Sequence, residues 1–556
     1  MNHRRGRLGR MIVALAIGLT LLAASCSSGD DNPSGDAQGE TGGEGPQGAP
    51  KRGGTLRYGL EAETDGLNPT TNRFAIAAYQ MAEAVYDPLA MRDKTGEVKP
   101  YLAESFTPNA DFTSWDIKLR PNIKFHDGTP LTSDALKAGT AAALADPLIS
   151  IAAKPILAPS NQVEIIDPLT ARINLSGPNT RFPLYLTSQL GMVPSPTWLA
   201  AAKADPDLNQ RPVGTGPFKF ESRTQDQSTK FVRNDEYWNG PVYLDAIEYV
   251  IQTDPARRAD QLLAGELDIM HSSDPQTIAA LREEQGINRY EDDKGEEGFI
   301  MINTQAPPFD DIRARKALAL ATPKQDYLEI IGQGILTPAD SMFIKDSPYY
   351  NDQVKQESDD PEGAKQLAAE YCGEKPAMCQ AGKIRMEFKY TGPSAANQLV
   401  ADTLTNGWKD VFEIKSDQVL QDDYIIQVAF GQYQVVTWRQ FGSDDPEGEF
   451  VWLDCRNVGQ PGTLGINWPR NCNQDTQTAL ETQRKSTDEA AIVDQWKKIA
   501  QEIHDDYLYV FLNHTIWQIA AKDNVGDVIE GKHPGGGVPR LGSIGSHTVS
   551  QIWLDR

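Results

Sequence analysis

What most constrains this chain is the length of its body: about 505 residues follow Pro50 without an apolar run that approaches eighteen residues. A membrane-spanning helix needs such a run, so we expect a soluble body. That many residues exceed what one hydrophobic core can organise, and two or more domains are expected. Helix-like and strand-like patterns alternate without an internal repeat, which predicts α/β domains with sheets covered by helices.

Capping signals predict where individual helices begin. Asp254 followed by Pro255 is typical of a helix start, because Asp caps the free N–H groups and Pro fits the first turn. Ser486 and Glu489 fit a capping box. An apolar stripe follows them at the spacing of one helical face, at positions 492, 496, 499 and 503.

The first 26 residues have the pattern of an export signal. Four arginines and no acid precede residues 11–24, which are almost wholly apolar but too short to span about 30 Å of hydrocarbon. The run ends in Leu-Leu-Ala-Ala-Ser-Cys, so Cys26 stands where a signal peptidase cuts. This end resembles a bacterial lipobox, which implies that residues 1–25 are removed and Cys26 is lipidated. Simple secretion with a free Cys26 is the alternative.

Residues 26–50 are interpreted as a lipidated, flexible tether. After Cys26 they hold seven glycines and five acids, with no base and no large apolar side chain, so they bury too little surface to become ordered. With the four signal-peptide arginines removed from 53 bases, 49 remain against 77 acids, a net charge of −28. Such a surface repels nucleic acid, so no nucleic-acid partner is expected. Plain solubility also explains the charge.

Four further cysteines form two pairs that are close in the sequence, Cys372 with Cys379 and Cys455 with Cys472. An even number in an exported chain predicts disulfides. Three pairings are possible, and adjacency favours joining each cysteine to its near neighbour. A zinc site is disfavoured because neither pair has a two-residue spacing and no histidine lies nearby, and we expect neither a metal nor a cofactor.

A series of short motifs in order along residues 53–525 resembles the peptide and nickel class of substrate-binding proteins of ABC importers, the family 5 extracellular solute-binding proteins. The match is carried by Gly53-Gly-Thr-Leu56, Gly66-Leu-Asn-Pro69, Leu102-Ala-Glu-Ser105, Leu119-Arg-Pro121, Phe125-His-Asp-Gly-Thr-Pro-Leu-Thr132, Pro212-Val-Gly-Thr-Gly-Pro-Phe218, Tyr237-Trp238, Leu244-Asp245, Ala264-Gly-Glu-Leu-Asp268, Asn303-Thr304 and Pro308-Phe-Asp-Asp-Ile-Arg313.

The resemblance implies an α/β, two-lobed periplasmic-binding-protein fold of type II, similar to cluster C, with a hinged ligand cleft and an extra domain inserted in lobe one. It implies a first lobe from residues 51–78, 213–302 and 523–556. The inserted domain is expected over 79–212 and the second lobe over 303–522.

The resemblance also points to ligand-binding residues. Peptide-binding relatives carry a Trp, then an Asp that pairs with the ligand's amino terminus, then an acid before Pro. The corresponding stretch is Trp438-Arg-Gln-Phe-Gly-Ser-Asp-Asp-Pro446, and counting from either end finds no Asp at the expected place. Trp438 is predicted to form a cleft wall, Arg439 to favour a ligand carboxylate, and Asp444 to replace the missing Asp through a changed loop. Asn303 completes this candidate set. Core packing for Trp438 and a solvated loop for Arg439 are the alternatives.

No catalytic residue is predicted. His126 has no nucleophile at a recognisable spacing, and neither a metalloprotease helix motif nor a Gly-x-Ser-x-Gly elbow occurs. The expected function is capture of short peptides or peptide-like solutes by a monomer on the outer face of the cytoplasmic membrane, in the cell envelope or periplasmic space. It would be anchored by lipid and would supply an ABC permease and ATPase. The alternatives are a receptor for an oligosaccharide, a metal chelate or haem, and an orphan envelope sensor.

Overall fold

The computed structural model describes residues 46, 48–440, 445–529, 533–535 and 547–556. The predicted signal peptide, Cys26 and nearly all of the predicted tether therefore lie outside the described residues, as does Asp444. None of the described helices combines the length and the hydropathy that a membrane crossing requires.

The first seven-stranded sheet collects strands from distant parts of the sequence. In spatial order they are β12 (Ile287–Asp292), β20 (Trp517–Lys522), β11 (Ile269–Ser272), β1 (Thr55–Leu60), β10 (Ala246–Ile251), β9 (Ser228–Arg233) and β8 (Phe218–Thr224). Strand β1 runs parallel to β10 and β11, and the other pairs are antiparallel. Leu56 and Tyr58 are fully buried in a core shared with α1 (Ile76–Val85).

The second sheet is built from the middle and the end of the chain. Its order is β14 (Thr337–Pro338), β19 (Tyr509–His514), β13 (Glu297–Ile302), β18 (Val435–Gln440), β16 (Lys383–Thr391) and β15 (Cys379–Gln380), and β17 (Phe412–Val419) also pairs with β16. Strands β17 and β18 run parallel to β16. The helices that accompany this sheet are α7 (Ile312–Ala321), α8 (Lys324–Ile330), α9 (Pro361–Glu374), α10 (Ala395–Trp408) and α11 (Gln421–Ala429).

The chain passes between these two sheets at two places, from β12 to β13 and from β19 to β20. The exchange points therefore lie between Asp292 and Glu297 and between His514 and Trp517. They differ by several residues from the predicted lobe boundaries at 302/303 and 522/523, because β13 belongs to the second sheet and β20 to the first. Two short connections, side by side, join the two sheets.

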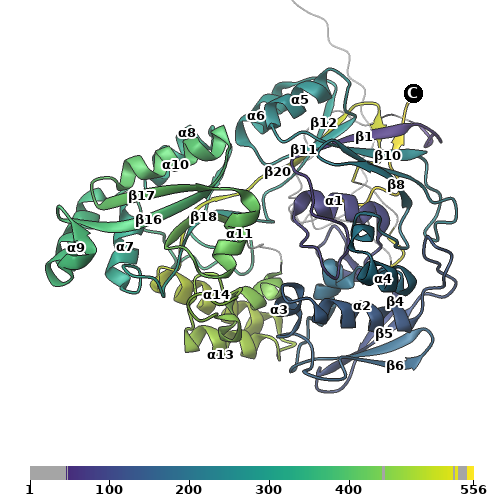
Figure 1. Ribbon diagram of the computed structural model, residues 1–556, viewed down its shortest axis with the longest axis horizontal. Helices are drawn as coiled ribbons and strands as arrows, with labels where there is room; N and C mark the ends of the chain where they lie inside the picture. The colour runs from purple at the N-terminus through teal and green to yellow at the C-terminus, as the bar shows by residue number, and fades with distance from the viewer. Residues whose placement is uncertain (1–45, 47, 441–444, 530–532, 536–546) are drawn as a thin grey trace, which may run out of the picture. The chain divides into compact units, whose positions relative to one another are not determined.

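A third, antiparallel sheet of four strands lies within the predicted insertion. Its order is β4 (Ala103–Pro108), β5 (Ser114–Leu119), β7 (Thr170–Asn174) and β6 (Val163–Asp167). Strands β2 (Ala90–Arg92) and β3 (Val98–Pro100) form a hairpin, and β21 (Val525–Gly526) pairs with β22 (Trp553–Leu554). The helices here are α2 (Ser133–Ala145), α3 (Ile149–Ala153) and α4 (Pro196–Ala204). In Figure 1, α2 lies beside this sheet, and α7, α9 and α10 lie against the second sheet.

The capping signals are confirmed in one helix and corrected in another. Helix α5 (Pro255–Leu263) begins as predicted, and the Asp254 side chain accepts a hydrogen bond from the backbone N–H of Arg257. Helix α14 (Glu489–Asp505) buries the predicted stripe, but its cap is Asp488, which accepts from Ala490, and not Ser486. Ser486 instead accepts from the Asp488 N–H in the preceding turn. The remaining helices are α6 (Pro275–Glu283), α12 (Phe450–Leu453) and α13 (Gln474–Gln483).

His126 joins two of the motif blocks and has a structural role. Its Nε2 lies 2.9 Å from the Gly216 carbonyl oxygen, and its Nδ1 accepts from the Gly214 N–H at 3.4 Å. Both glycines are required by packing, because a Cβ at either position would come within 3 Å of the Val85 carbonyl oxygen. Burial lowers the pKa of His126 to about 4, so the ring is neutral near pH 7.

Both disulfides that sequence adjacency favours are present. Cys372 bonds to Cys379, and Cys455 bonds to Cys472. The first ties the end of α9 to β15, and the second closes the loop between α12 and α13. Each constrains a short local segment of the second half of the chain.

Candidate functional site

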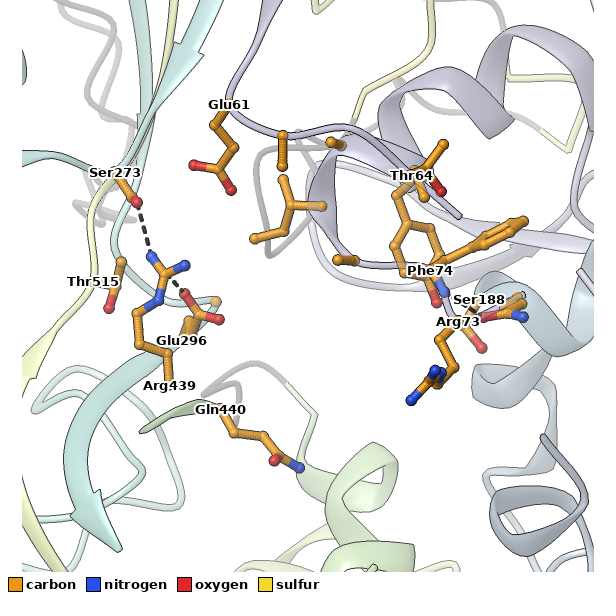
Figure 2. Close-up of a pocket in the computed structure, with 18 of the residues that line it drawn as sticks. Glu61, Thr64, Arg73, Phe74, Ser188, Ser273, Glu296, Arg439, Gln440 and Thr515 are labelled. Atoms are coloured by element: carbon orange, nitrogen blue, oxygen red, sulfur yellow. Dashed lines mark hydrogen bonds and ion pairs between the residues drawn. The ribbon is translucent and has the colours of Figure 1, made fainter. Parts of the chain in front are cut away.

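A cavity of about 2130 Å³ is lined by residues of both large sheets and of the predicted insertion. Small-molecule pockets usually measure roughly 300–1,000 Å³. Its lining includes residues 61–65 after β1, the α1 entrance, α2, α3 and the end of β18. Figure 2 shows Arg73 and Phe74 on one side of this space and Arg439 on the other. The cavity has room for a ligand larger than a typical metabolite.

The two connections between the sheets form one part of the cavity wall. The Thr515 N–H donates to the Glu296 carbonyl at 2.8 Å, which links one connection to the other. Trp517 Nε1 donates to Glu296 Oε2 at 3.2 Å. Burial raises the pKa of the Glu296 carboxyl, while the Arg439 charge acts in the opposite direction. A few residues here are placed where a hinge would absorb rotation between the sheets.

Arg439, at the end of β18, reaches from the second sheet to the first. Its side chain is 43% exposed and lines the cavity. Nη1 donates to Ser273 Oγ at 2.8 Å, just after β11, and lies 3.7 Å from Glu296 Oε2. The guanidinium also lies 5.3 Å from the centre of the Trp517 ring. Figure 2 shows the contacts of Arg439 with Ser273 and Glu296 and the open space beside them.

Thr515 supplies a second polar group at this place. The residue is 4% exposed and lines the cavity. Its Oγ1 has no hydrogen-bond partner among the residues that the structure describes. A buried hydroxyl without a partner is costly.

Trp438 belongs to an aromatic wall that lines the cavity. Its ring stacks on Tyr424 with centroids 5.8 Å apart, and it packs on Trp468 at 5.7 Å. Trp468 in turn stacks on Trp452 at 5.2 Å. The indole N–H groups of Trp438 and Trp468 both donate to Gln440 Oε1, at 3.0 and 2.7 Å. This wall, Tyr424, Trp438, Trp452 and Trp468, presents a large and rigid apolar surface to a ligand.

Glu449 lines the cavity beside this wall, at the end of the short 3-10 helix η5 (Pro446–Glu449). Burial raises the pKa of its carboxyl to about 8, and the neighbouring Gln440 amide acts against the shift. Within the described part of the chain, neither Glu449 Oε2 nor Gln440 Nε2 has a hydrogen-bond partner.

The structure brings only two of the four predicted ligand-binding residues to the cavity. Trp438 and Arg439 line it. Asp444 lies outside the described residues. Asn303 is not part of the lining: it is 3% exposed, and its Nδ2 donates to the carbonyl oxygens of Gly431 and Tyr433 at 3.1 and 2.9 Å. There it holds the end of β13 against the turn before β18.

Several lining residues were missed by reasoning from the sequence. Glu449 is three residues beyond Pro446, so extending the stretch that begins at Trp438 by three residues would have included it. Ser273 and Thr515 carry no local signal, because their partners lie 166 and 219 residues away in the sequence. Among the described residues, no group of three or more His, Cys, Asp or Glu side chains is arranged to hold a metal ion.

Comparisons with known proteins find similarity over most of the chain. Residues 97–460 match the family model described as bacterial extracellular solute-binding proteins, family 5 middle. Di/tripeptide-binding protein 2 of Pseudomonas aeruginosa (strain UCBPP-PA14) is 26% identical over 501 residues, which cover 85% of this chain and 91% of that protein.

Solved structures are similar over nearly their whole length. The periplasmic binding protein DppA from Helicobacter pylori, in complex with the peptide STSA, has a TM-score of 0.78 at 19% identity, covering 91% of this chain and 99% of that one. AgaA from A. tumefacien R10, in complex with agropinic acid, also has a TM-score of 0.78, at 22% identity, with coverage of 90% and 99%. The fold is therefore shared with both.

Proposed function

Because this chain belongs to the bacterial extracellular solute-binding proteins of family 5 and has their two-lobed α/β fold, we propose that it captures short peptides or peptide-like solutes for an ABC importer. The observation that carries the proposal is the cavity, which is lined from both large sheets and joined at one wall by two short connections. Lobes that rotate about such connections close around a solute. The importer would then distinguish loaded from empty receptor by shape.

The choice of peptides is supported by the similarity to a protein named for di- and tripeptides over 85% of this chain. It is also supported by the polar groups at the connections. Arg439, Ser273 and Thr515 offer N–H and O–H donors around one point, which suits a carboxylate. We assign the carboxyl end of the ligand to this place and a flat side-chain contact to Trp438.

The remaining features of the proposal lie outside the described residues or concern partners. We propose that residues 1–25 are removed and that Cys26 carries the lipid, which places the body at the outer face of the cytoplasmic membrane. A permease and an ATPase would receive the solute from the monomeric receptor. Asp444 keeps its predicted role of replacing the missing Asp, which would pair with the amino terminus of the ligand. No catalytic role is assigned to any residue.

A non-peptide solute is the second candidate. The cavity volume of about 2130 Å³ favours it, since this exceeds the roughly 300–1,000 Å³ of common small-molecule sites. An oligosaccharide, a metal chelate or haem would use more of that space than a dipeptide. The peptide proposal is preferred because donor groups for a carboxylate are present at Arg439.

The test is a binding screen on the purified body, residues 46–556. Native mass spectrometry is expected to find a bound small molecule after mild purification. A library of two- to five-residue peptides is expected to raise the melting temperature, since ligand at a hundred times its Kd stabilises the folded state by about 2.7 kcal/mol. If the peptides give no shift while sugars, metal chelates or haem do, the second candidate replaces the first.

The role of Arg439 has its own matched experiment. Arg439→Gln is expected to abolish the preference for peptides with a free carboxyl end over their C-terminal amides. Arg385→Gln removes the same charge from an exposed position on β16 and is expected to keep that preference. Equal discrimination by wild type and Arg439→Gln would contradict the assignment.

A further inference from the structure

The motif Gly66-Leu-Asn-Pro69 fixes the loop between β1 and α1, which forms part of the cavity wall. Asn68 Oδ1 accepts hydrogen bonds from the Thr70 N–H at 2.9 Å and from the Thr70 hydroxyl at 2.8 Å. The Asn68 N–H donates to Asn72 Oδ1 at 3.0 Å. A Cβ at Gly66 would lie 2.6 Å from that same Asn72 oxygen, so a larger residue would disturb the contact. Buried polar side chains of the loop itself therefore define its shape.

Gln189, from the predicted insertion, holds the same loop from outside. Its Nε2 donates to the carbonyl oxygens of Pro69 and Asn72, both at 2.8 Å. Its Oε1 accepts from the Phe74 N–H at 3.4 Å. The Phe74 ring packs edge-on against Tyr79, with centroids 5.6 Å apart. The backbone on both sides of position 73 is thus held in place, which reduces the entropy lost when a side chain there binds a ligand.

This loop presents the exposed side chain of Arg73 to the cavity, on the side opposite Arg439 (Figure 2). Among the residues that the structure describes, none accepts a hydrogen bond from the Arg73 guanidinium or forms an ion pair with it. Two other arginines of the lining do have partners. Arg439 Nη1 donates to Ser273 Oγ at 2.8 Å, and Arg258 Nε donates to the His271 carbonyl oxygen at 3.0 Å. Arg73 therefore keeps its N–H donors for a ligand.

Acidic side chains outnumber basic ones in the described lining, but none of them neutralises Arg73. Glu63, which precedes the loop, pairs with Arg223 at 2.7 Å, and Asp445 pairs with Arg181 at 2.9 Å. An anionic group of a solute that reaches Arg73 meets a positive charge without a competing counter-ion. Elsewhere in this acidic lining the same group would be repelled, so the contact selects both the charge of the group and its position.

We propose that Arg73 binds a side-chain carboxylate of the solute, so that the cavity selects peptides with an aspartate or a glutamate away from the carboxyl end. The inference rests on the proposed function, because it adds a second anionic contact to the one assigned to Arg439 in the same cavity. The planar guanidinium can donate two parallel hydrogen bonds to a carboxylate. Because the two arginines lie on opposite sides of the cavity, one solute with two carboxylates would be held from both sides.

The test compares peptides that differ only in this charge. Isothermal titration calorimetry would use alanine peptides of two to five residues that carry one glutamate, and matched peptides with glutamine at the same position. All of them keep a free carboxyl end for Arg439. Wild type is expected to bind the best glutamate peptide about tenfold more tightly than its glutamine counterpart, as a hydrogen bond between charged groups would give. Arg73→Gln is expected to bind the two equally and to keep the wild-type affinity for the glutamine peptide.

Arg211→Gln provides the matched control. Arg211 is also exposed, and its side chain likewise has no partner within the described part of the chain, but it lies outside the cavity lining. This variant is expected to keep the preference for glutamate. A preference that persists in Arg73→Gln, or that is lost equally in Arg211→Gln, would overturn the inference.

Two results with wild type separate this inference from the function on which it rests. Equal affinity for the glutamate and glutamine peptides would overturn the role of Arg73 and leave peptide capture standing. If no peptide of either series binds, peptide capture itself fails, and the inference fails with it.

Discussion

Substitution of Glu447 tests whether the buried contact between the predicted insertion and the second half of the chain is held by one carboxylate. Glu447 is fully buried in η5. It accepts hydrogen bonds from Asn179 Nδ2 at 2.9 Å, from the Tyr185 hydroxyl at 2.8 Å and from Arg484 Nε at 2.8 Å. Gln483 Nε2 is a further donor. These donors come from both sides of the contact, so the carboxylate is their common acceptor.

Glu447→Gln keeps the shape and removes the charge. Arg484 is 6% exposed and would remain buried without its counter-charge. Removing one member of a buried ion pair costs about 3–5 kcal/mol. At about 2.1 cal/mol/K of unfolding entropy per residue, a body of about 505 residues shifts by roughly 1 °C per kcal/mol, so the melting temperature should fall by roughly 3–5 °C.

The assay combines urea unfolding with hydrogen exchange of residues 179–187. We expect the exchange in this segment to rise in Glu447→Gln, since its acceptor across the contact changes from a carboxylate to a neutral amide oxygen, which binds the donors more weakly. Glu104→Gln is the control: Glu104 pairs with Lys118, but both side chains are about half exposed, so little change is expected. A free-energy change in Glu447→Gln below about 1 kcal/mol, or unchanged exchange in the segment, would refute the reasoning.

Three further outcomes are expected. Trp438→Ala should weaken peptide binding roughly tenfold, or about 1.4 kcal/mol, with little loss of stability; a large fall in melting temperature would place the ring in the core instead. Burial raises the pKa of Asp87 from 3.8 to about 6, so the folded state holds the proton more tightly than the unfolded state. As pH rises between these values, the unfolding free energy of wild type should therefore fall by about 3 kcal/mol relative to that of Asp87→Asn. If urea unfolding gives the same pH dependence of the unfolding free energy for both proteins, this expectation is contradicted. Replacing Cys455 and Cys472 by Ser should lower the unfolding free energy by about 3 kcal/mol, measured with urea, because the disulfide closes a loop with a sequence separation of 17; an unchanged midpoint would argue against it.

Local signals predicted the elements well where the relevant contacts are local. The Asp254 cap of α5 and the buried stripe of α14 were both predicted from the sequence, since capping contacts and helical faces involve residues no more than four positions apart. The start of α14 was misassigned because Ser486 and Asp488 compete for the same turn. Asp488 is the cap because its carboxylate accepts from Ala490.

The candidate site was predicted only in part, and Asn303 shows why. It belongs to a motif of the family, yet its amide binds two backbone carbonyls at the end of β13, away from the cavity. A motif identifies which residues a fold requires, and it does not separate those that hold the backbone from those that contact a ligand. That distinction depends on where each side chain is buried.

The sequence by itself determined the class of the protein: its ordered motifs identified the family, its alternating patterns predicted α/β domains, and adjacent cysteines indicated both disulfides. Only the tertiary structure decided which groups share the cavity. Arg439 meets Ser273 through the crossing of two sheets, 166 residues apart in the chain. Burial in the cavity wall raises the pKa of Glu449, and its neighbour Gln440 comes from the preceding strand β18. Spacing along a chain encodes helices and strands, whereas burial and charge at a site arise from contacts that form only when distant segments pack together.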